Sequence, residues 1–256
     1  MSRKIPQDRF VIIIGAGKCG TSSLFEYLSS HPKVCPCSLK EPEYFSENKR
    51  HGCMSPYSKR VKDLNTSKTI IIDRYEDLWD YDETIHSYAM EASTGYSTFP
   101  HEQNVAKNIH EYGLEPKLIY IVRNPFDRIE SQYNFSRRFS RADIITKYSI
   151  NYSKYNLQLE QYRKYFNAEN ILVIDFDELK NNSFSLQRTV YDFLSLPDTD
   201  FPDKYPVVNS TSIDSKSKKR ILTMQERNYI HKELQIDMSN LHVNYGIDVQ
   251  KWGFDT

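Results

Sequence analysis

A glycine-rich stretch near the N-terminus, GAGKCGTSSL at residues 15–24, follows the apolar run FVIII at residues 10–14. Glycines between a buried strand and a helix let several backbone N–H groups converge, and the helix N-terminus adds partial positive charge. The stretch therefore predicts an anion site; the alternative is an ordinary tight turn. Thr21 and Ser22 are expected to cap the helix. A triphosphate-binding loop carries lysine directly after its second glycine. Here Thr21 holds that position, and the lysine, Lys18, lies two residues before Gly20.

A second anion-binding pattern lies in KLIYIVRNPFDRIESQY, residues 117–133. Arg123 ends an apolar strand, at the edge of the sheet where ligands of open α/β folds collect. Pro125 suits the first position of a helix, and Arg128 and Ser131 share one face of that helix because they are three residues apart. Arg123, Ser131 and the helix N-terminus together predict a separate phosphate site. A surface pair of arginines that makes ion pairs is the alternative.

GAGKCGTSSL and RNPFDRIESQY together resemble the two donor-binding signatures of sulfotransferases that use 3′-phosphoadenosine 5′-phosphosulfate (PAPS). The resemblance is greatest to the heparan-sulfate-type branch, and further segments match it in the same order: KEPEYF (40–45), EASTGY (91–96), YNLQLEQYRKYFNAENILVIDFDEL (155–179), SKKR (217–220) and YGIDVQKW (245–252). The resemblance implies that the residues that hold the 5′ end of the donor are Gly17, Lys18, Cys19, Gly20, Thr21 and Ser22. It also implies that Arg123 and Ser131 hold the 3′-phosphate, and that Lys218 and Arg220 belong to a basic loop over the donor.

The resemblance also suggests the catalytic residues. Sulfuryl transfer needs an activated acceptor, a stabilised leaving oxygen and accurate positioning. Lys18 is expected to stabilise the leaving phosphate oxygen, and Glu41, in KEPEYF, to act as the general base. Glu43 is a rival base, on the same side as Glu41 if the segment is extended. No metal is expected.

The acceptor side departs from the polysaccharide-sulfating relatives. DRYEDLWDYDE, residues 73–83, has six acids against one arginine, and an acidic surface with aromatic residues suits a cation. Tyr75, Trp79 and Tyr81 lie between the acids. Tyr75 and Trp79 are expected to bind the acceptor, together with Glu41 and with Tyr96 of the EASTGY segment. Ala92 replaces the lysine that the polysaccharide enzymes carry. These features favour a hydroxyl on a small neutral or cationic metabolite, including guanidinium natural products.

Other interpretations of the acceptor side and of the chemistry stay open. The acidic run is alternatively a solvated helix with its aromatics in the core, and the acceptor is alternatively a glycan. A P-loop kinase, with Asp175 and Asp177 near magnesium, is a less favoured alternative, as is a non-catalytic nucleotide-binding protein.

The elements that must position these residues follow from the hydrophobic pattern. Short apolar runs alternate with longer amphipathic stretches, which predicts an α/β fold with a parallel sheet between helices. Strands are predicted at residues 10–14, 69–72, 87–90, 117–122 and 170–174. Helices are predicted at 21–30, 102–112, 125–138, 149–166, 184–195 and 223–238.

Composition limits the class of protein. The chain of 256 residues fits one domain, residues 1–256. Lysine plus arginine and aspartate plus glutamate both number 34, which disfavours a nucleic-acid partner. The first apolar run is too short for a signal peptide or membrane span, and four cysteines without metal-site spacing suggest free thiols. We expect a soluble cytoplasmic protein; its oligomeric state is open.

Overall fold

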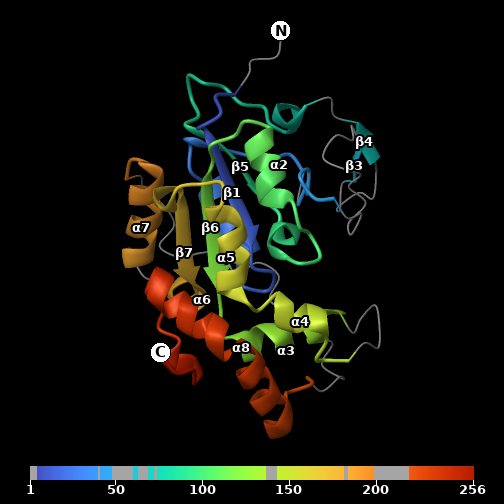
Figure 1. Ribbon diagram of the computed structural model, residues 1–256. Helices are drawn as coiled ribbons and strands as arrows, with labels where there is room; N and C mark the ends of the chain where they lie inside the picture. The colour runs from blue at the N-terminus through green and yellow to red at the C-terminus, as the bar shows by residue number, and fades with distance from the viewer. Residues whose placement is uncertain are drawn as a thin grey trace.

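The computed structural model describes residues 5–39, 41–47, 60–62, 69–71, 74–136, 143–181, 184–198 and 219–256. Its centre is a parallel sheet of five strands in the order β2-β5-β1-β6-β7 (Figure 1). The strands are β1 (Phe10–Gly15), β2 (Val34–Pro36), β5 (Tyr88–Ala92), β6 (Lys117–Val122) and β7 (Ile171–Asp175). The predicted α/β class with a parallel sheet is therefore confirmed.

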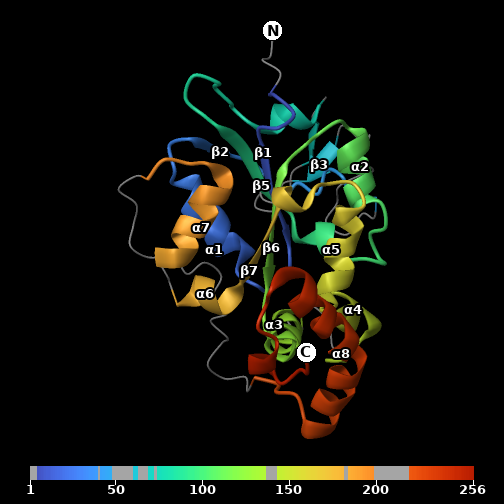
Figure 2. The ribbon, with the colours of Figure 1, turned by 60° about the vertical axis from the view of Figure 1, so that its left-hand side comes forward.

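Helices cover both faces of this sheet and the carboxyl ends of its strands (Figures 1 and 2). One face carries α1 (Thr21–Ser29), α6 (Phe176–Lys180) and α7 (Phe184–Leu194), and the other carries α2 (Val105–Glu111) and α5 (Tyr155–Arg163). Beyond the carboxyl ends lie α3 (Pro125–Ser136), α4 (Lys147–Asn151) and α8 (Met224–Tyr245). Short 3-10 helices are η1 (Tyr75–Leu78), η2 (Thr94–Ser97), η3 (Ala168–Asn170) and η4 (Gln250–Trp252).

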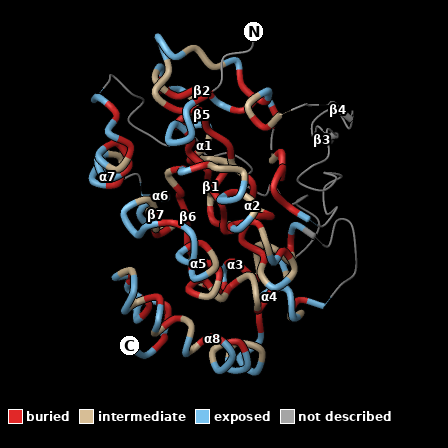
Figure 3. The backbone as a smooth tube through the Cα atoms, turned by 45° about the horizontal axis from the view of Figure 1, so that its top comes forward, coloured by how far each residue is buried: buried red, intermediate tan, exposed pale blue. Residues whose placement is uncertain are grey.

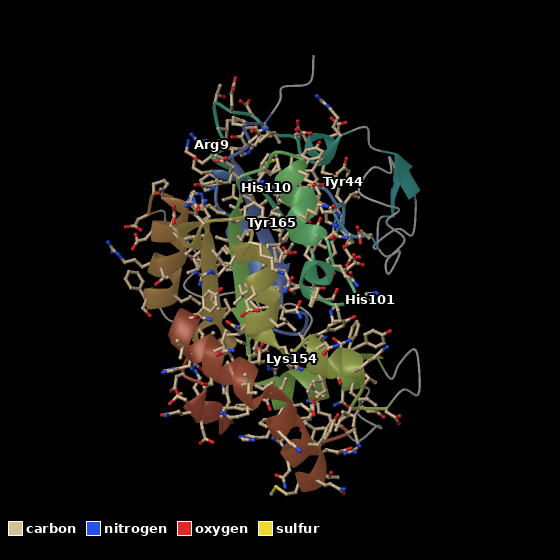
Figure 4. The ribbon with its side chains drawn as sticks, in the orientation of Figure 1. Arg9, Tyr44, His101, His110, Lys154 and Tyr165 are labelled. Atoms are coloured by element: carbon tan, nitrogen blue, oxygen red, sulfur yellow. The ribbon has the colours of Figure 1, made fainter. Side chains whose placement is uncertain are left out.

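The hydrophobic core lies along the central strands. Every residue of β1 is buried, and so is β6 after its first residue (Figure 3). Such continuous apolar strands are typical of a parallel sheet covered on both faces. On the face covered by α2 and α5, His110 of α2 and Tyr165, just after α5, lie side by side, with their ring centroids 5.5 Å apart (Figure 4).

Two predictions about the strands were wrong. Residues 69–71 form β4 (Thr69–Ile71), which pairs antiparallel with β3 (Arg60–Lys62) in a separate sheet rather than joining the central one. The fifth central strand is β2, which the sequence analysis missed. It has three residues, ends in Pro36 and lies at the sheet edge, where proline is tolerated, so its apolar pattern is too short to recognise.

The helices also differ from the prediction in part. Residues 149–166 contain the end of α4 and all of α5 instead of one helix. The break lies at Ser153, whose buried hydroxyl donates to the Ser149 carbonyl and accepts from the Arg128 guanidinium. Helix α8 continues to Tyr245 and ends at Gly246, which adopts the left-handed conformation typical of a helix C-terminus. No helix in the described ranges is long and apolar enough to cross a membrane.

Candidate functional site

The glycine loop joins β1 to α1 at the carboxyl end of the sheet. Lys18 and Gly20 both have positive φ, 72° and 89°. Gly20, which has no side chain, is the N-cap of α1, so the expectation that Thr21 or Ser22 occupies the cap position is wrong. The first N–H groups of a helix have no partner within the helix. The loop and the start of α1 can therefore receive an anion.

Both its positive φ and the packing of neighbouring side chains explain why residue 20 is a glycine. A Cβ on Gly20 would lie 2.9 Å from Leu179 and 3.0 Å from Phe176, which is closer than side chains pack. Gly17 differs, because its nearest neighbour would be Thr94 at an ordinary 3.8 Å. The loop thus packs closely at both ends, with Gly20 against α6 and Gly15 against Ser97 of η2, where an added Cβ would collide with the Ser97 side chain, and has room only at Gly17.

Lys18 and Cys19, the two loop residues with functional groups, lie in different surroundings. The Lys18 ammonium lies over the Phe135 ring, 4.0 Å from its centroid. The Cys19 thiol is fully buried, and burial raises its pKa to about 11. The thiol is therefore neutral at physiological pH, and any contact of Cys19 with an anion falls to its backbone.

Arg123 links the end of β6 to the glycine loop. Its Nη1 donates to the Lys18 carbonyl at 3.0 Å, and its guanidinium lies over the Phe176 ring at 4.6 Å. Its own carbonyl accepts from the Tyr155 hydroxyl at 2.7 Å. Its Nε is buried without a hydrogen-bond partner in the described part of the chain. A buried, unpaired guanidinium N–H fits an anion such as phosphate.

Ser131 is half-buried on α3, in the chain segment that follows Arg123. Arg128, on the same helix, is 1% exposed, so the alternative of a surface arginine pair is wrong. Its Nη2 donates to the Ser149 carbonyl at 2.8 Å and its Nε to Ser153 at 2.8 Å. Arg128 therefore holds α4 against α3.

Lys218 lies outside the described residues. Arg220 lies against α3, because its backbone N–H and carbonyl both hydrogen-bond the Asn134 amide at 3.0 Å. Its guanidinium forms an ion pair with Glu226 at 2.6 Å. The predicted contact of Arg220 with a donor stays a prediction.

Glu41 lines a pocket at the N-terminus of α1. The pocket has a volume of about 180 Å³ and is lined by Thr21, Ser22, Phe25, Glu26, Cys37, Ser38, Leu39, Glu41 and Ala92. The Thr94 hydroxyl donates to Glu41 Oε2 at 3.0 Å. The structure thus brings the start of α1 and the expected base into one cavity.

Glu43 differs from Glu41 in its surroundings. Both residues have positive φ, 46° and 49° respectively, so the segment is not extended and the two side chains need not share a side. Glu43 is 1% exposed, and its carboxylate packs against Gly95, where an added Cβ would collide with it. Glu43 does not line the pocket, which favours Glu41 as the base.

The three aromatic residues expected to bind the acceptor lie in the core instead. Tyr75 is 0%, Tyr96 2% and Trp79 8% exposed. The Trp79 Nε1 donates to the Met90 carbonyl at 3.0 Å. Neighbours distant in sequence bury these rings, so the alternative that the aromatics of the acidic run face the core is correct for Tyr75 and Trp79. None of the three residues lines the pocket, so the predicted acceptor contact is wrong for them.

Sequence reasoning missed Glu91, a fully buried carboxyl on β5. It accepts hydrogen bonds from the hydroxyls of Tyr75 at 2.5 Å, Ser93 at 2.6 Å and Tyr96 at 3.0 Å. Burial raises the pKa of Glu91 to about 7, against the lowering effect of these hydrogen bonds. A glutamate inside the apolar strand YAMEA was the available signal, because buried carboxyl groups need partners.

The residues expected to hold magnesium in a kinase are used elsewhere. Asp175 Oδ1 accepts from the Asp177 N–H at the start of α6, and Oδ2 lies 2.5 Å from the Lys251 ammonium. Among the described residues, no group of three or more His, Cys, Asp or Glu side chains could hold a metal ion. The Cys19, Cys35 and Cys37 thiols are free.

A parallel sheet with a glycine loop after its first strand and an arginine at the end of the adjacent strand defines an α/β protein of the phosphate-loop class. A family model described as "Sulfotransferase domain" matches residues 8–244. The chain therefore belongs to the sulfotransferase family, and the kinase alternative is not supported.

Two curated relatives illustrate the similarity. The chain is 28% identical over 205 residues to heparan sulfate glucosamine 3-O-sulfotransferase 5 of Homo sapiens, covering 73% of this chain and 53% of that protein. It is 23% identical over 212 residues to the bifunctional heparan sulfate N-deacetylase/N-sulfotransferase 4 of Mus musculus, covering 72% and 22%. The chain spans about half the length of the first of these relatives.

Solved structures share the fold. A sulfotransferase from Alicyclobacillus acidocaldarius has a TM-score of 0.73 at 22% identity, covering 97% of this chain and all of that one. The sulfotransferase domain from the curacin biosynthetic pathway has a TM-score of 0.58 at 13% identity, covering 93% and 98%. Both likenesses concern the fold.

Proposed function

We propose that this protein transfers the sulfuryl group of PAPS to a hydroxyl of a small neutral or cationic acceptor. The observation that carries the proposal is the pocket that joins Thr21 and Ser22, at the N-terminus of α1, to Glu41. In-line transfer requires the attacking oxygen of the acceptor and the leaving oxygen of the donor on opposite sides of the sulfur, with the base beside the attacking hydroxyl. Membership of the sulfotransferase family supports this chemistry.

The residues of the loop fit a phosphosulfate donor. The N-terminus of α1 has no side-chain cap, and Arg123 keeps a buried N–H without a partner in the described structure. In this proposal, backbone N–H groups from Gly17 to Ser22 hold the 5′ end, and Arg123 and Ser131 hold the 3′-phosphate. Bound PAPS supplies an activated sulfuryl group and a phosphate leaving group.

Two side chains assist the transfer in opposite ways. Glu41 removes the proton of the acceptor hydroxyl as the new S–O bond forms. Lys18 places positive charge near the bridging oxygen, which keeps the electron pair of the broken S–O bond. The products are a sulfate ester, adenosine 3′,5′-bisphosphate and a proton on Glu41.

The pocket also supports the class of acceptor. Its volume of about 180 Å³ is below the roughly 300–1,000 Å³ of sites for drug-sized ligands. Phe25 offers an apolar wall, and the carboxyl groups of Glu26 and Glu41 offer negative charge. Ala92 lines the same pocket in place of a lysine. These features favour a compact acceptor with a positive charge; the heparan sulfate relatives favour a glycan as the second candidate.

Calorimetric titration with adenosine 3′,5′-bisphosphate tests the donor site, with ATP plus magnesium as the comparison. We expect the bisphosphate to bind more tightly, and Arg123→Ala to weaken it by about a hundredfold, since two charged hydrogen bonds contribute about 3 kcal/mol or more. The matched control is Arg188→Ala, which removes an exposed arginine of α7. Tighter binding of ATP would contradict the proposal.

Three phenols with a two-carbon para chain that ends in a cation, a methyl group or a carboxylate test the acceptor: tyramine, para-ethylphenol and para-hydroxyphenylpropionate. With radiolabelled PAPS as the donor, kcat/KM should be highest for tyramine, lower for ethylphenol and lowest for hydroxyphenylpropionate. Glu26→Gln should reduce the advantage of tyramine over ethylphenol. Glu41→Gln should lower kcat on the order of a hundredfold or more while bisphosphate affinity stays. A preference for the anionic phenol, or for a glucosamine oligosaccharide, would contradict the proposed acceptor class.

A further inference from the structure

Four side chains form a closed hydrogen-bonded group beside the pocket, here called the Glu91 cluster: Tyr75, Glu91, Ser93 and Tyr96. All are 2% exposed or less. Three hydroxyl groups donate to the carboxylate. The hydroxyls of Tyr75 and Tyr96 donate to Oε1, and the Ser93 hydroxyl donates to Oε2. Above its pKa of about 7 the Glu91 carboxylate is ionised and only accepts hydrogen bonds, so it fixes the direction in which each hydroxyl points.

Two of these hydroxyls also hold the loop that carries Glu41. The Glu43 N–H donates to Ser93 Oγ at 3.1 Å, and the Phe45 N–H donates to Tyr96 Oη at 3.3 Å. Each hydroxyl therefore accepts from the loop backbone and donates to Glu91. The Tyr75 hydroxyl also donates to Glu91. Among the described residues, no backbone N–H of the Glu41 loop donates to it.

The loop needs such support because its backbone is strained. Glu41 and Glu43 both occupy the left-handed region, which is unfavourable for residues with a Cβ and persists only where surrounding contacts enforce it. Phe45 packs on Tyr75 with centroids 4.6 Å apart, and Tyr44, labelled in Figure 4, lies 5.1 Å from the Tyr75 ring. These contacts hold the side chains, and the Glu91 cluster holds the backbone.

We propose that Glu91 is a positioning residue for sulfuryl transfer. Through Ser93 and Tyr96 it fixes the backbone at residues 43 and 45, and so places the Glu41 carboxylate at the pocket. The next residue of the same strand-to-turn segment, Thr94, donates directly to Glu41 Oε2 at 3.0 Å. The inference rests on the proposed role of Glu41 as the base.

A purely structural role predicts a different result from a positioning role. Tyr75→Phe and Tyr96→Phe each remove one hydroxyl that donates to Glu91 Oε1 and keep the ring. Only Tyr96→Phe also removes the acceptor of a loop amide. A structural role would lower stability without separating the two variants in kcat. A positioning role makes Tyr96→Phe and Ser93→Ala slower than Tyr75→Phe.

The experiment measures kcat with tyramine and PAPS, and bisphosphate affinity by calorimetry, for Ser93→Ala, Tyr96→Phe, Tyr75→Phe and Glu41→Gln. We expect kcat in Ser93→Ala and Tyr96→Phe to be about tenfold or more below that of Tyr75→Phe, since misplacement by about 1 Å can slow a reaction about a hundredfold. Bisphosphate affinity should stay within about twofold of wild type.

Hydrogen exchange of the 41–47 segment gives a readout that does not need an acceptor. Exchange should be faster in Ser93→Ala and Tyr96→Phe than in Tyr75→Phe. Equal kcat and equal exchange in all three would overturn the inference. If Glu41→Gln retained wild-type kcat, the proposed base would be wrong. If instead kcat fell in Glu41→Gln but did not differ among the other three variants, only the positioning role of Glu91 would be rejected.

Discussion

Replacing Glu91 with glutamine should change how stability depends on pH. Burial raises the pKa of this carboxyl from its ordinary value of 4.5 to about 7. Between these values the folded protein holds a proton that the unfolded chain has released, so the free energy of unfolding falls as pH rises. The contribution is fully present below about pH 4.5 and is lost by the time the pH exceeds the folded pKa of about 7.

The size of this effect follows from the same shift. At 1.36 kcal/mol per pKa unit, the rise from 4.5 to about 7 corresponds to about 3 kcal/mol, of which about 2–3 kcal/mol falls between about pH 5 and about pH 8. Glutamine does not titrate. The unfolding free energy of wild type minus that of Glu91→Gln should therefore decrease by this amount across the interval.

Urea unfolding of both proteins at these two pH values measures the effect, because groups other than Glu91 titrate in both proteins and largely cancel. Equal m-values would show that both proteins unfold in the same two-state manner. A difference that stays constant with pH would refute the reasoning. It would mean that the hydroxyls of Tyr75, Ser93 and Tyr96 stabilise the ionised carboxylate as strongly as burial destabilises it.

Three further predictions concern other positions in the chain. Gly20→Ala should reduce the unfolding free energy, measured by urea titration, by about 2 kcal/mol or more, because the φ of Gly20 is 89° and an added Cβ would lie 2.9 Å from Leu179. In the control Gly17→Ala, the added Cβ has no close neighbour, so the unfolding free energy should change by less than about 1 kcal/mol. Asp237→Ala should lower Tm, since the carboxylate accepts two backbone N–H groups at the start of α5 and an unsatisfied buried donor costs about 1–3 kcal/mol. The Cys19 thiol, buried with its pKa raised to about 11, should react with iodoacetamide far more slowly in the native protein than in urea; comparable rates would contradict its burial.

The position of the glycine loop beside Arg123 could be predicted from the sequence because its signals are local. Strands β1 and β6 are continuous apolar runs, and the chemistry follows each within a few residues: the glycine loop after β1 and Arg123 after β6. The two strands pair side by side, with Ile13 opposite Ile119, so the loop and the arginine lie close together. Parallel pairing brings the carboxyl ends of such strands to the same edge.

The acceptor side could not be predicted in the same way because its contacts join distant segments. Whether Tyr75 faces solvent or the core depends on Glu91, Phe45 and Phe10, none of which is near it in sequence. An acidic run with aromatics at intervals is compatible with both arrangements. The prediction of an aromatic acceptor surface failed for this reason, since burial was decided by tertiary packing rather than by local pattern.

This contrast suggests how the two halves of the site respond to substitution. The glycine loop is fixed by its own backbone angles, by α6 at Gly20 and by η2 at Gly15 and Gly17, so changes within the loop should affect donor binding directly. The loop of Glu41 is instead held by hydroxyl groups some 50 residues away, as the bond between Glu43 and Ser93 illustrates. Substitutions of Ser93 and Tyr96, whose hydroxyls accept from the loop of Glu41, should therefore alter the acceptor pocket and the position of Glu41 while bisphosphate affinity stays unchanged. Measuring both quantities in the same variants separates the two halves, and a variant of Ser93 that weakened bisphosphate binding as much as turnover would show that they are coupled.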